Sequence, residues 1–391
     1  MSNIYLNSTQ LKTELKKCLQ CKNKPCMQAC PAHCSPCDFI AEALKNNFKK
    51  AAELIVHNNP QAECCGLICP DKFCMKACLR AKLDYAIKIP QIQATIMKKA
   101  EESGNISIQC PKTNNKKIAI IGSGPAALGA SLQLICSGYN VEIFEKENNL
   151  GGSLNLIPEY RLPKNVIQND WKRIENTNKV KIHLNSEIKS FEHLLSKGFE
   201  GVIVACGEEK CCTLGIQGEE FTISCFDYLK NPNNFITQEK VAIVGGGAVA
   251  VDCAVTAKKL GAQSVEMFVR RGISNMRLTI NERNELINEH VDITPLTRIT
   301  KIEKNDNNLR LTTIKTQFDN TGKLIDLPNS EIIRNDFSLI ILALGGKKIS
   351  PSKIHNNIIY AGDCINGGTT AVEAVASGKN AADKLIKQIS D

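Results

Sequence analysis

KKIAIIGSGPAALGASLQLICSGYNVEIFEK (116–146) is a short apolar strand, a glycine turn, a helix pattern and a second strand that ends in an acid. Gly122, Gly124 and Ala127 form a Gly-x-Gly-x-x-Ala fingerprint of dinucleotide binding. Gly124 lets the backbone approach a pyrophosphate at the helix N-terminus, and Glu145, about 20 residues on, is placed to bind a ribose hydroxyl. A lone glycine triplet is weak evidence, but the acid at this distance makes the prediction strong.

A second copy of this unit, EKVAIVGGGAVAVDCAVTAKKLGAQSVEMFVRRG, spans residues 239–272. Arg270 and Arg271 stand where the first copy has its acid, and Arg277 follows. An acid there would repel a 2′-phosphate, whereas guanidinium groups bind one bidentately. We therefore predict NADPH at the second site and FAD at the first. The alternative is that these arginines are solvated surface residues.

The FAD domain is predicted to close near the C-terminus. Buried-looking strands follow each unit at 201–207 and 338–346, and IIYAGD (358–363) precedes a helix pattern that begins near Thr369. Asp363 can hydrogen-bond the ribityl chain of a flavin, and the positive end of the helix can stabilise reduced flavin.

The N-terminal region is rich in cysteine, with 11 of the 19 cysteines of the chain at residues 18–78. One spacing occurs twice, as Cys21-x4-Cys26-x3-Cys30 and Cys69-x4-Cys74-x3-Cys78. Thiols four residues apart on a helical turn share one face, and residues 38–59 between the copies have helical periodicity. The spacing is similar to bacterial ferredoxin runs and favours two [4Fe–4S] clusters, with zinc as the alternative.

Composition limits the remaining classes. The chain has 391 residues, 43% hydrophobic, which is enough for two or three domains. No signal peptide and no apolar run of membrane-spanning length is recognisable, so we expect a cytoplasmic protein in which cysteine clusters bind metal. The net charge of +9 is spread along the chain; it indicates a solvated basic surface, and we predict neither nucleic-acid nor membrane binding.

No Cys-x-x-Cys lies between residues 116 and 391. A flavin bound there has no Cys-x-x-Cys disulfide to reduce, so the cysteine-rich region is the expected exit for its electrons.

With these parts in place, the chain resembles the family of the glutamate synthase small subunit and the N-terminal half of dihydropyrimidine dehydrogenase, over about residues 15–391. Within that family it is most similar to the flavoprotein subunits of bacterial two-subunit dihydropyrimidine dehydrogenases. The resemblance is carried by CLQCKNKPCMQACPA, NNPQAECCGLICPDKFCMKAC, GSGPAALGA, FEKENNLGGSLNLIPEYRLP, GGGAVAVDCA, RRGISNMR and AGDCINGGTTAVEAVASGK.

The resemblance implies specific ligand sets. The first [4Fe–4S] cluster falls on Cys18, Cys21, Cys26 and Cys78, and the second on Cys30, Cys69, Cys74 and Gln93. FAD contacts fall on Gly122, Ser123, Gly124, Pro125, Ala126, Glu145, Lys146, Gly152, Ser153, Arg161, Gly362, Asp363, Thr369 and Thr370. NADPH contacts fall on Gly246, Gly247, Ala248, Val249, Arg270, Arg271, Arg277, Ala343 and Gly345. No catalytic residue is predicted.

Two features depart from the family pattern. Cys34, Cys37, Cys64 and Cys65 are extra; we interpret them as spare thiols, with an altered ligand set left open. The bacterial pyrimidine subunits favour NADH, whereas Arg270 and Arg271 argue for NADPH.

The predicted fold class is α/β, with an NADPH domain inserted in an FAD domain, both Rossmann-like, after a helical domain with two clusters. The predicted boundaries are 1–115 (helical iron–sulfur), 116–220 and 346–391 (FAD-binding), and 221–345 (NAD(P)H-binding).

The resemblance implies an electron-input subunit that passes electrons from NADPH through FAD and the clusters to a separate flavin-containing catalytic subunit in a hetero-oligomer. The partner is expected to reduce uracil or thymine; glutamate synthase is the alternative partner. A non-catalytic, zinc-stabilised scaffold is the hypothesis from a different class, against which the intact Asp363, both glycine turns and the arginines argue.

Overall fold

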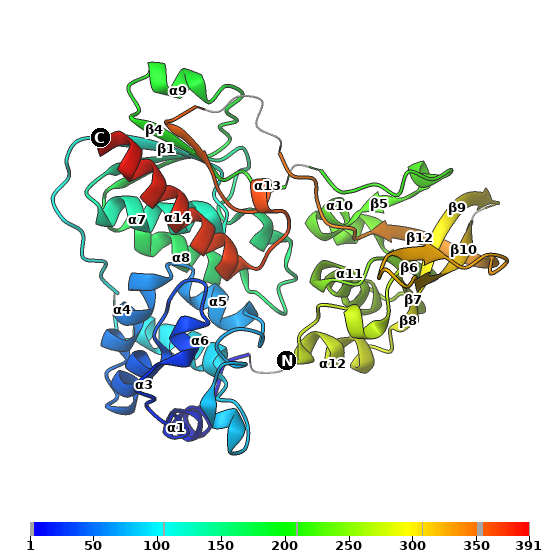
Figure 1. Ribbon diagram of the computed structural model, residues 1–391, viewed down its shortest axis with the longest axis horizontal. Helices are drawn as coiled ribbons and strands as arrows, with labels where there is room; N and C mark the ends of the chain where they lie inside the picture. The colour runs from blue at the N-terminus through cyan, green and yellow to red at the C-terminus, as the bar shows by residue number, and fades with distance from the viewer. Residues whose placement is uncertain (1–3, 105, 209, 307, 350–354, 391) are drawn as a thin grey trace. The chain divides into compact units, whose positions relative to one another are not determined.

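The computed structural model describes residues 4–104, 106–208, 210–306, 308–349 and 355–390 (Figure 1). The chain forms two compact units. The first contains the described residues up to 155, of 159–208 and from 348 on, and the second contains 156–158 and 210–347. The predicted helical segment lies in the first unit, together with the FAD-binding segments except for 156–158, 210–220 and 346–347. The predicted NAD(P)H-binding segment 221–345 lies in the second.

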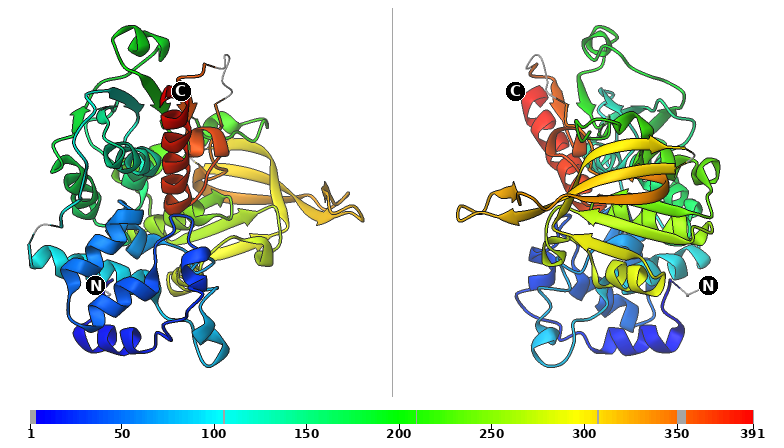
Figure 2. Two further views of the ribbon diagram at one scale, coloured as in Figure 1. Left: turned by 60° about the vertical axis from the view of Figure 1, so that its left-hand side comes forward. Right: turned by 90° about the vertical axis from the view of Figure 1, so that its right-hand side faces the viewer.

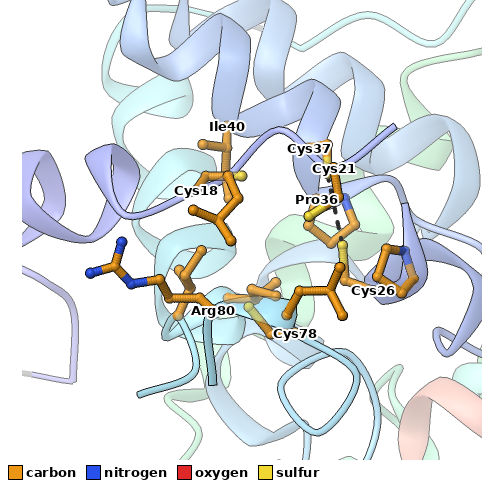
Figure 3. Close-up of a pocket in the computed structure, with 13 residues that line it drawn as sticks. Cys18, Cys21, Cys26, Pro36, Cys37, Ile40, Cys78 and Arg80 are labelled. Carbon is orange, nitrogen blue, oxygen red and sulfur yellow. Dashed lines mark hydrogen bonds between the residues drawn. The ribbon is translucent and has the colours of Figure 1, made fainter. Parts of the chain in front are cut away.

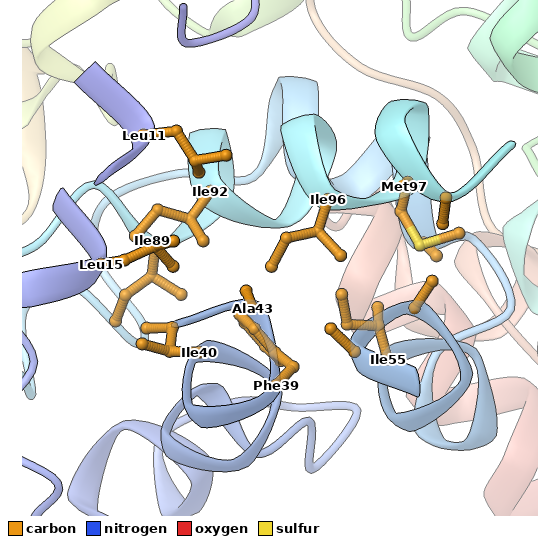
Figure 4. Close-up of a cluster of buried hydrophobic side chains, with 14 of the residues drawn as sticks. Leu11, Leu15, Phe39, Ile40, Ala43, Ile55, Ile89, Ile92, Ile96 and Met97 are labelled. Atoms are coloured by element: carbon orange, nitrogen blue, oxygen red, sulfur yellow. The ribbon is translucent and has the colours of Figure 1, made fainter. Parts of the chain in front are cut away.

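The N-terminal part of the first unit is helical. Its elements are α1 (Ser8–Lys16), α2 (Pro25–Gln28), α3 (Pro36–Leu44), α4 (Phe48–Asn58), α5 (Ala62–Ile68), the 3-10 helix η1 (Leu79–Lys82) and α6 (Ile89–Glu102). Buried side chains of α1, α3, α4 and α6, among them Leu15, Phe39, Ile55 and Ile92, form one core (Figure 4). The helices predicted between the two cysteine runs are confirmed as α3 and α4.

The prediction that thiols four apart lie together on helical turns is wrong. Cys26 lies in α2, but that helix ends at Gln28, before Cys30. Cys74 and Cys78 lie outside the helices, in and after a run of turns at residues 71–77. Pro31 disfavours a helical backbone at Cys30, the residue before it, so α2 stops after one turn.

The FAD-binding part of the first unit is a five-stranded parallel sheet in the order β13-β4-β1-β2-β3. The strands are β1 (Lys117–Ile121), β2 (Asn140–Phe144), β3 (Val180–His183), β4 (Gly201–Val204) and β13 (Ile358–Tyr360). The helices are α7 (Pro125–Cys136), η2 (Gly152–Leu156), α8 (Lys164–Glu175), α9 (Glu192–Ser196), α13 (Asp363–Asn366) and α14 (Ala371–Ser390).

Helices α7 and α14 pack closely side by side (Figure 1). A Cβ added at Gly378 of α14 would lie 1.9 Å from the carbonyl oxygen of Ala126, and one at Gly129 of α7 would lie 2.3 Å from that of Val375. Glycine is required at both positions because the helix backbones touch there. The contact fixes the start of α7 against α14.

A buried carboxylate joins the helical segment to the FAD-binding part. Asp170 on α8 is 0% exposed and accepts hydrogen bonds from the Gln61 side chain at 2.8 Å and from the backbone N–H of Cys64 at 3.1 Å. Arg173 forms an ion pair with it. Lys379 on α14 adds a second tie, because its ammonium donates to the carbonyl of Asn58 at 2.8 Å. A buried charge with this many partners fixes α5 against α8.

The second unit contains a mixed sheet in the order β11-β10-β12-β6-β7-β8, with β5 beside β12 and β9 beside β10. The strands are β5 (Ile223–Ser224), β6 (Lys240–Val244), β7 (Ser264–Val269), β8 (Asp292–Pro295), β9 (Thr297–Asn305), β10 (Asn308–Phe318), β11 (Leu324–Asp326) and β12 (Ile332–Leu342). The remaining elements are α10 (Cys225–Lys230), α11 (Ala248–Lys259), α12 (Ile280–Asn288), η3 (Glu219–Phe221), η4 (Pro232–Phe235) and η5 (Ile273–Asn275). Figure 2 shows the end of β10 and β11 projecting beyond the rest of this sheet.

Candidate flavin, nicotinamide and iron–sulfur sites

The first glycine turn connects β1 to α7. Gly122 has φ +97°, and a Cβ there would lie 2.5 Å from the carbonyl oxygen of Ala205, so the turn requires glycine. A Cβ at Gly124, the N-cap of α7, would meet nothing within 4 Å. Pro125 and Ala126 then begin the helix. This arrangement leaves an open backbone surface at a helix N-terminus, which fits a pyrophosphate.

The predicted ribose-binding acid is held by this turn. Glu145 follows β2, and its carboxylate accepts hydrogen bonds from the Ser123 hydroxyl at 2.5 Å and from the backbone N–H of Glu147 at 2.9 Å. The indole N–H of Trp171 donates to the carbonyl of Ser123 at 3.2 Å. The structure therefore brings together Ser123 and Glu145, two of the predicted FAD contacts.

The other predicted flavin contacts of this region are in the same unit. Lys146, Gly152 and Ser153 are exposed, and Arg161 is half-buried. A Cβ at Gly152 would lie 3.0 Å from the Cα of Gly124, so the loop that carries Gly152 lies against the glycine turn.

The C-terminal flavin contacts lie against the same turn. A Cβ at Gly362, which has φ +77°, would lie 2.8 Å from the Cβ of Ala126. The Asp363 carboxylate accepts hydrogen bonds from the backbone N–H and the hydroxyl of Thr369, at 3.1 and 2.5 Å. Thr370 is tied to Glu373 in the first turn of α14. Burial raises the pKa of Asp363 to about 6.

The raised pKa of Asp363 predicts how FAD retention depends on pH. The ionised carboxylate accepts both Thr369 hydrogen bonds and can accept a further one from a ribityl hydroxyl, whereas protonation makes one of its oxygens a donor and removes the charge that strengthens these bonds. As the pH falls through about 6, protonation competes with flavin binding, so the FAD dissociation constant should rise by up to tenfold per pH unit between pH 6 and 5. Flavin fluorescence on dialysis measures this. Asp363→Asn should bind FAD more weakly at pH 8 and lose the pH dependence, and an unchanged slope in that variant would exclude Asp363.

The second glycine turn connects β6 to α11 in the second unit. Gly245 has φ +144°, and a Cβ there would lie 2.3 Å from the carbonyl oxygen of Ala343. The turn continues through Gly246, Gly247, Ala248 and Val249, and a Cβ at Gly247 would meet nothing within 4 Å. Gly345, also predicted to contact NADPH, follows β12 and is exposed. The open backbone at the start of α11 repeats the geometry of the first turn.

The predicted phosphate-binding arginines surround the end of β7. Arg270 and Arg271 follow the strand directly, and both are exposed, as is Arg277. Backbone bonds hold the pair: the Thr316 hydroxyl donates to the carbonyl of Arg270 at 2.7 Å, and the N–H of Leu296 to that of Arg271 at 3.1 Å. In the described part of the chain, no carboxylate forms an ion pair with any of the three guanidinium groups. They are thus available to an anion.

The four thiols predicted for the first cluster line one cavity, which also contains a fifth (Figure 3). The cavity is lined by Cys18, Leu19, Cys21, Pro25, Cys26, Pro36, Cys37, Ile40, Cys78, Leu79, Arg80, Ile87 and Ile89. Burial raises the pKa of Cys26 to about 12. Among the described residues no three metal-ligating groups converge on one point; the thiols are spread around an apolar wall. The thiol donor set and the apolar lining fit an iron–sulfur cluster.

The thiols predicted for the second cluster lie at a different place. Cys30 and Cys69 pack with Phe73 and Ala371 around the buried residues Ala32, Cys34, Cys65, Val372 and Val375. Hydrogen bonding from the Cys34 thiol lowers the pKa of Cys30 to about 6. Burial, together with the nearby Cys30 thiol, raises the pKa of Cys74 to about 12, so Cys74 belongs to this group. We call Cys30, Cys69 and Cys74 the second thiol set.

Gln93, the predicted fourth ligand, is buried on α6, and its amide N–H donates to the carbonyl of Ala62 on α5 at 2.6 Å. This contact is made at the start of α5, whereas Cys69 follows its end. The extra thiols differ among themselves: Cys37 lines the first cavity, Cys34 and Cys65 pack with the second thiol set, and the backbone N–H of Cys64 binds Asp170. The sequence signals for Cys34 and Cys37 were the number of cysteines in the first run and the Cys-x-x-Cys spacing of this pair.

Comparisons with known proteins agree with this assembly. Residues 116–378 match the pyridine nucleotide-disulphide oxidoreductase family, and residues 2–105 match dihydropyrimidine dehydrogenase domain II, 4Fe-4S cluster. The protein is therefore a flavoprotein oxidoreductase dependent on NAD(P)H, with an iron–sulfur domain before two dinucleotide-binding regions.

More particularly, the chain belongs to the family of the small subunits of glutamate synthase and the flavoprotein subunits of dihydropyrimidine dehydrogenase. It is 32% identical to the NAD-dependent dihydropyrimidine dehydrogenase subunit PreT of Escherichia coli K12, over 95% of this chain and 92% of the relative. It is 27% identical to the glutamate synthase [NADPH] small chain of the same organism, over 96% and 91%.

The fold also has solved relatives. Mycobacterium tuberculosis FprA in complex with NADPH aligns with a TM-score of 0.62 at 15% identity, over 71% of this chain and 85% of FprA. This likeness supports the α/β fold. None of the helices in the described parts of the chain is long and apolar enough to cross a membrane.

Proposed function

We propose that the protein is the electron-input subunit of a two-subunit enzyme, which takes electrons from NADPH and delivers them to a separate catalytic subunit that has its own flavin and reduces uracil or thymine. One observation carries the proposal: Cys30 and Cys69 of the second thiol set pack with Ala371, Val372 and Val375, in the first turns of α14. Thr369 and Thr370, predicted to contact FAD, directly precede this helix.

Different residues of the chain would bind FAD and NADPH. Bound FAD would supply the chemistry that links two-electron transfer from a reduced nicotinamide to one-electron transfer to iron–sulfur clusters. The turn at Gly122–Ala126 and Asp363 would hold FAD, and the turn at Gly246–Val249 with Arg270 and Arg271 would hold NADPH.

The thiols supply a route away from the flavin. Cys30 and Cys69 of the second thiol set are next to α14, and Cys74 packs against the helical core that Cys18 and Cys78 contact. Electrons would therefore pass from the flavin to the cluster on the second thiol set, and from there to the cluster in the first cavity. Leu19 and Leu79 line that cavity and are 45% and 38% exposed, so it opens beside apolar surface on which a partner could dock.

The relatives support the partner. PreT is named as a subunit of dihydropyrimidine dehydrogenase, and the glutamate synthase chain as a small chain, so both relatives work with another polypeptide. We propose the same for this protein, as part of a hetero-oligomer. The higher identity to PreT favours pyrimidine reduction over glutamate synthesis.

Metal analysis of anaerobically purified protein tests the redox role. Two four-iron clusters predict about eight iron and eight sulfide per chain. Stoichiometric zinc with little iron would contradict the proposal and support the zinc-stabilised scaffold, because zinc has no redox chemistry. Reconstitution with candidate partners then decides the acceptor: reduction of uracil or thymine supports a pyrimidine enzyme, and glutamate formation supports a glutamate synthase.

A further inference from the structure

The fifth thiol of the first cavity, Cys37, has no assigned role. It is 4% exposed and lines the cavity with Cys18, Cys21, Cys26 and Cys78. Its sulfur lies 4.0 Å from that of Cys26, and Figure 3 shows this pair joined across the cavity wall. The pair comes from two segments, α2 and α3, that meet at this point.

Cys26 and Cys37 occupy equivalent positions at the starts of their helices. Each follows a proline that begins a helix, Pro25-Cys26 in α2 and Pro36-Cys37 in α3. Proline is favoured at this position because its fixed φ suits the first turn and its missing N–H is not needed there. Each thiol therefore projects from the same position of a helix start.

An ion pair connects the two helix starts. The ammonium of Lys24, the residue before α2, lies 2.7 and 2.8 Å from the two carboxylate oxygens of Asp38 on α3. Lys24 itself adopts a left-handed conformation, with φ +41°. The bridge spans the residues directly beside the two proline–cysteine pairs, so it holds their thiols at a common place.

The sulfur separation places both thiols within reach of one metal position. Two sulfurs on one tetrahedral metal, each about 2.3 Å from it, lie about 3.8 Å apart. In a four-iron cluster with four cysteine ligands, each iron takes one thiolate from the protein. Two thiols 4.0 Å apart are therefore suited to the same iron, and only one of them can be its ligand at a time.

We propose that Cys37 is a reserve ligand, which competes with Cys26 for one iron of the cluster in the first cavity and replaces it when Cys26 is lost. The inference rests on the proposed function only in requiring a cluster in this cavity. The exchange breaks one iron–thiolate bond and forms another, with a proton passing from the incoming thiol to the outgoing one. It involves no change in the oxidation state of iron or sulfur.

Alanine variants test the reserve ligand, because serine oxygen could itself bind iron. Cys26→Ala and Cys37→Ala should each keep the wild-type iron and sulfide content. The double variant should lose about half of both, as should Cys21→Ala, the matched control. The electron paramagnetic resonance spectrum of the reduced cluster should change in Cys26→Ala, where the ligand is exchanged, and not in Cys37→Ala.

Two outcomes would overturn the proposal: Cys26→Ala losing as much iron as Cys21→Ala, or the double variant keeping its iron. FAD content and circular dichroism report folding. If Cys26→Ala does not fold, the iron content and spectrum of Cys26→Val, whose side chain has no donor atom, are compared with those of Cys26→Val/Cys37→Ala. Equal iron content and identical spectra exclude Cys37 as a ligand, and loss of iron in the double variant supports it. A wild-type protein without iron would instead contradict the proposed function, and this inference with it.

Discussion

Cys78→Ala and Cys30→Ala variants should still let NADPH bleach the flavin, while electron delivery to the partner subunit falls to background. Hydride transfer to FAD needs only the two nucleotide sites, whose glycine turns lie after β1 and β6. Delivery needs the thiols, since Cys78 lines the first cavity and Cys30 belongs to the second thiol set. Anaerobic stopped-flow spectra measure the first step, and partner-dependent pyrimidine reduction measures the second.

Loss of a cluster could also unfold the helical segment, because Cys78 packs against its core. Flavin content and circular dichroism therefore accompany each assay. Cys212→Ala serves as the matched control, since Cys212 is half-buried and lies in the second unit, and it should keep both steps. A folded variant that lacks a cluster and yet drives the partner at the wild-type rate would show that electrons leave directly from FAD.

Arg271→Ala should raise the dissociation constant for NADPH roughly tenfold to a hundredfold and leave that for NADH nearly unchanged. Arg271 follows β7 and is exposed without a carboxylate partner in the described chain, so its guanidinium is available to a 2′-phosphate. A charge-assisted hydrogen bond of this kind contributes about 1.5–3 kcal/mol. Isothermal titration with both nucleotides measures the difference.

Lys304→Ala is the matched control for net charge, because Lys304 is an exposed cation of the same unit on β9. It should weaken both nucleotides little and equally. Added salt should reduce the advantage of NADPH in the wild type more than in Arg271→Ala, since screening acts on the phosphate contact. An equal loss of affinity for NADPH and NADH in Arg271→Ala would mean that this arginine does not read the phosphate.

The two glycine turns could be predicted from sequence because their constraints are local. A strand, a glycine with positive φ and a helix start follow one another within ten residues, and Gly122 and Gly245 both show the close carbonyl contact that excludes a side chain. The family membership and the fold class were predicted correctly for the same reason. The positions of individual cofactor contacts stay predictions.

The gathering of the thiols could not be predicted from spacing. Cys26 and Cys30 are four apart but separate, because α2 ends between them, whereas Cys26 and Cys37 meet through packing of α2 on α3. The strands β9 and β10 were missed although TRITKIEKN and NLRLTTIKTQF alternate in part. The two strands are stabilised by pairing with each other, and the sequence of one strand alone does not reveal its partner.

The buried hydrogen bonds of Asp170 to Gln61 and Cys64 have a consequence for the order of folding and cluster insertion. The cysteine runs emerge first from the ribosome, but the N-terminus of α5, the helix that Cys69 follows, is completed by a carboxylate that is synthesised more than a hundred residues later. The apolar wall around Cys30 and Cys69 comes later still, with Val372 and Val375. Cys30 and Cys69 are thus made long before their apolar surroundings, so we expect a cluster on them to be inserted only after residue 375 has been synthesised, and until then these unligated thiols are exposed to oxidants.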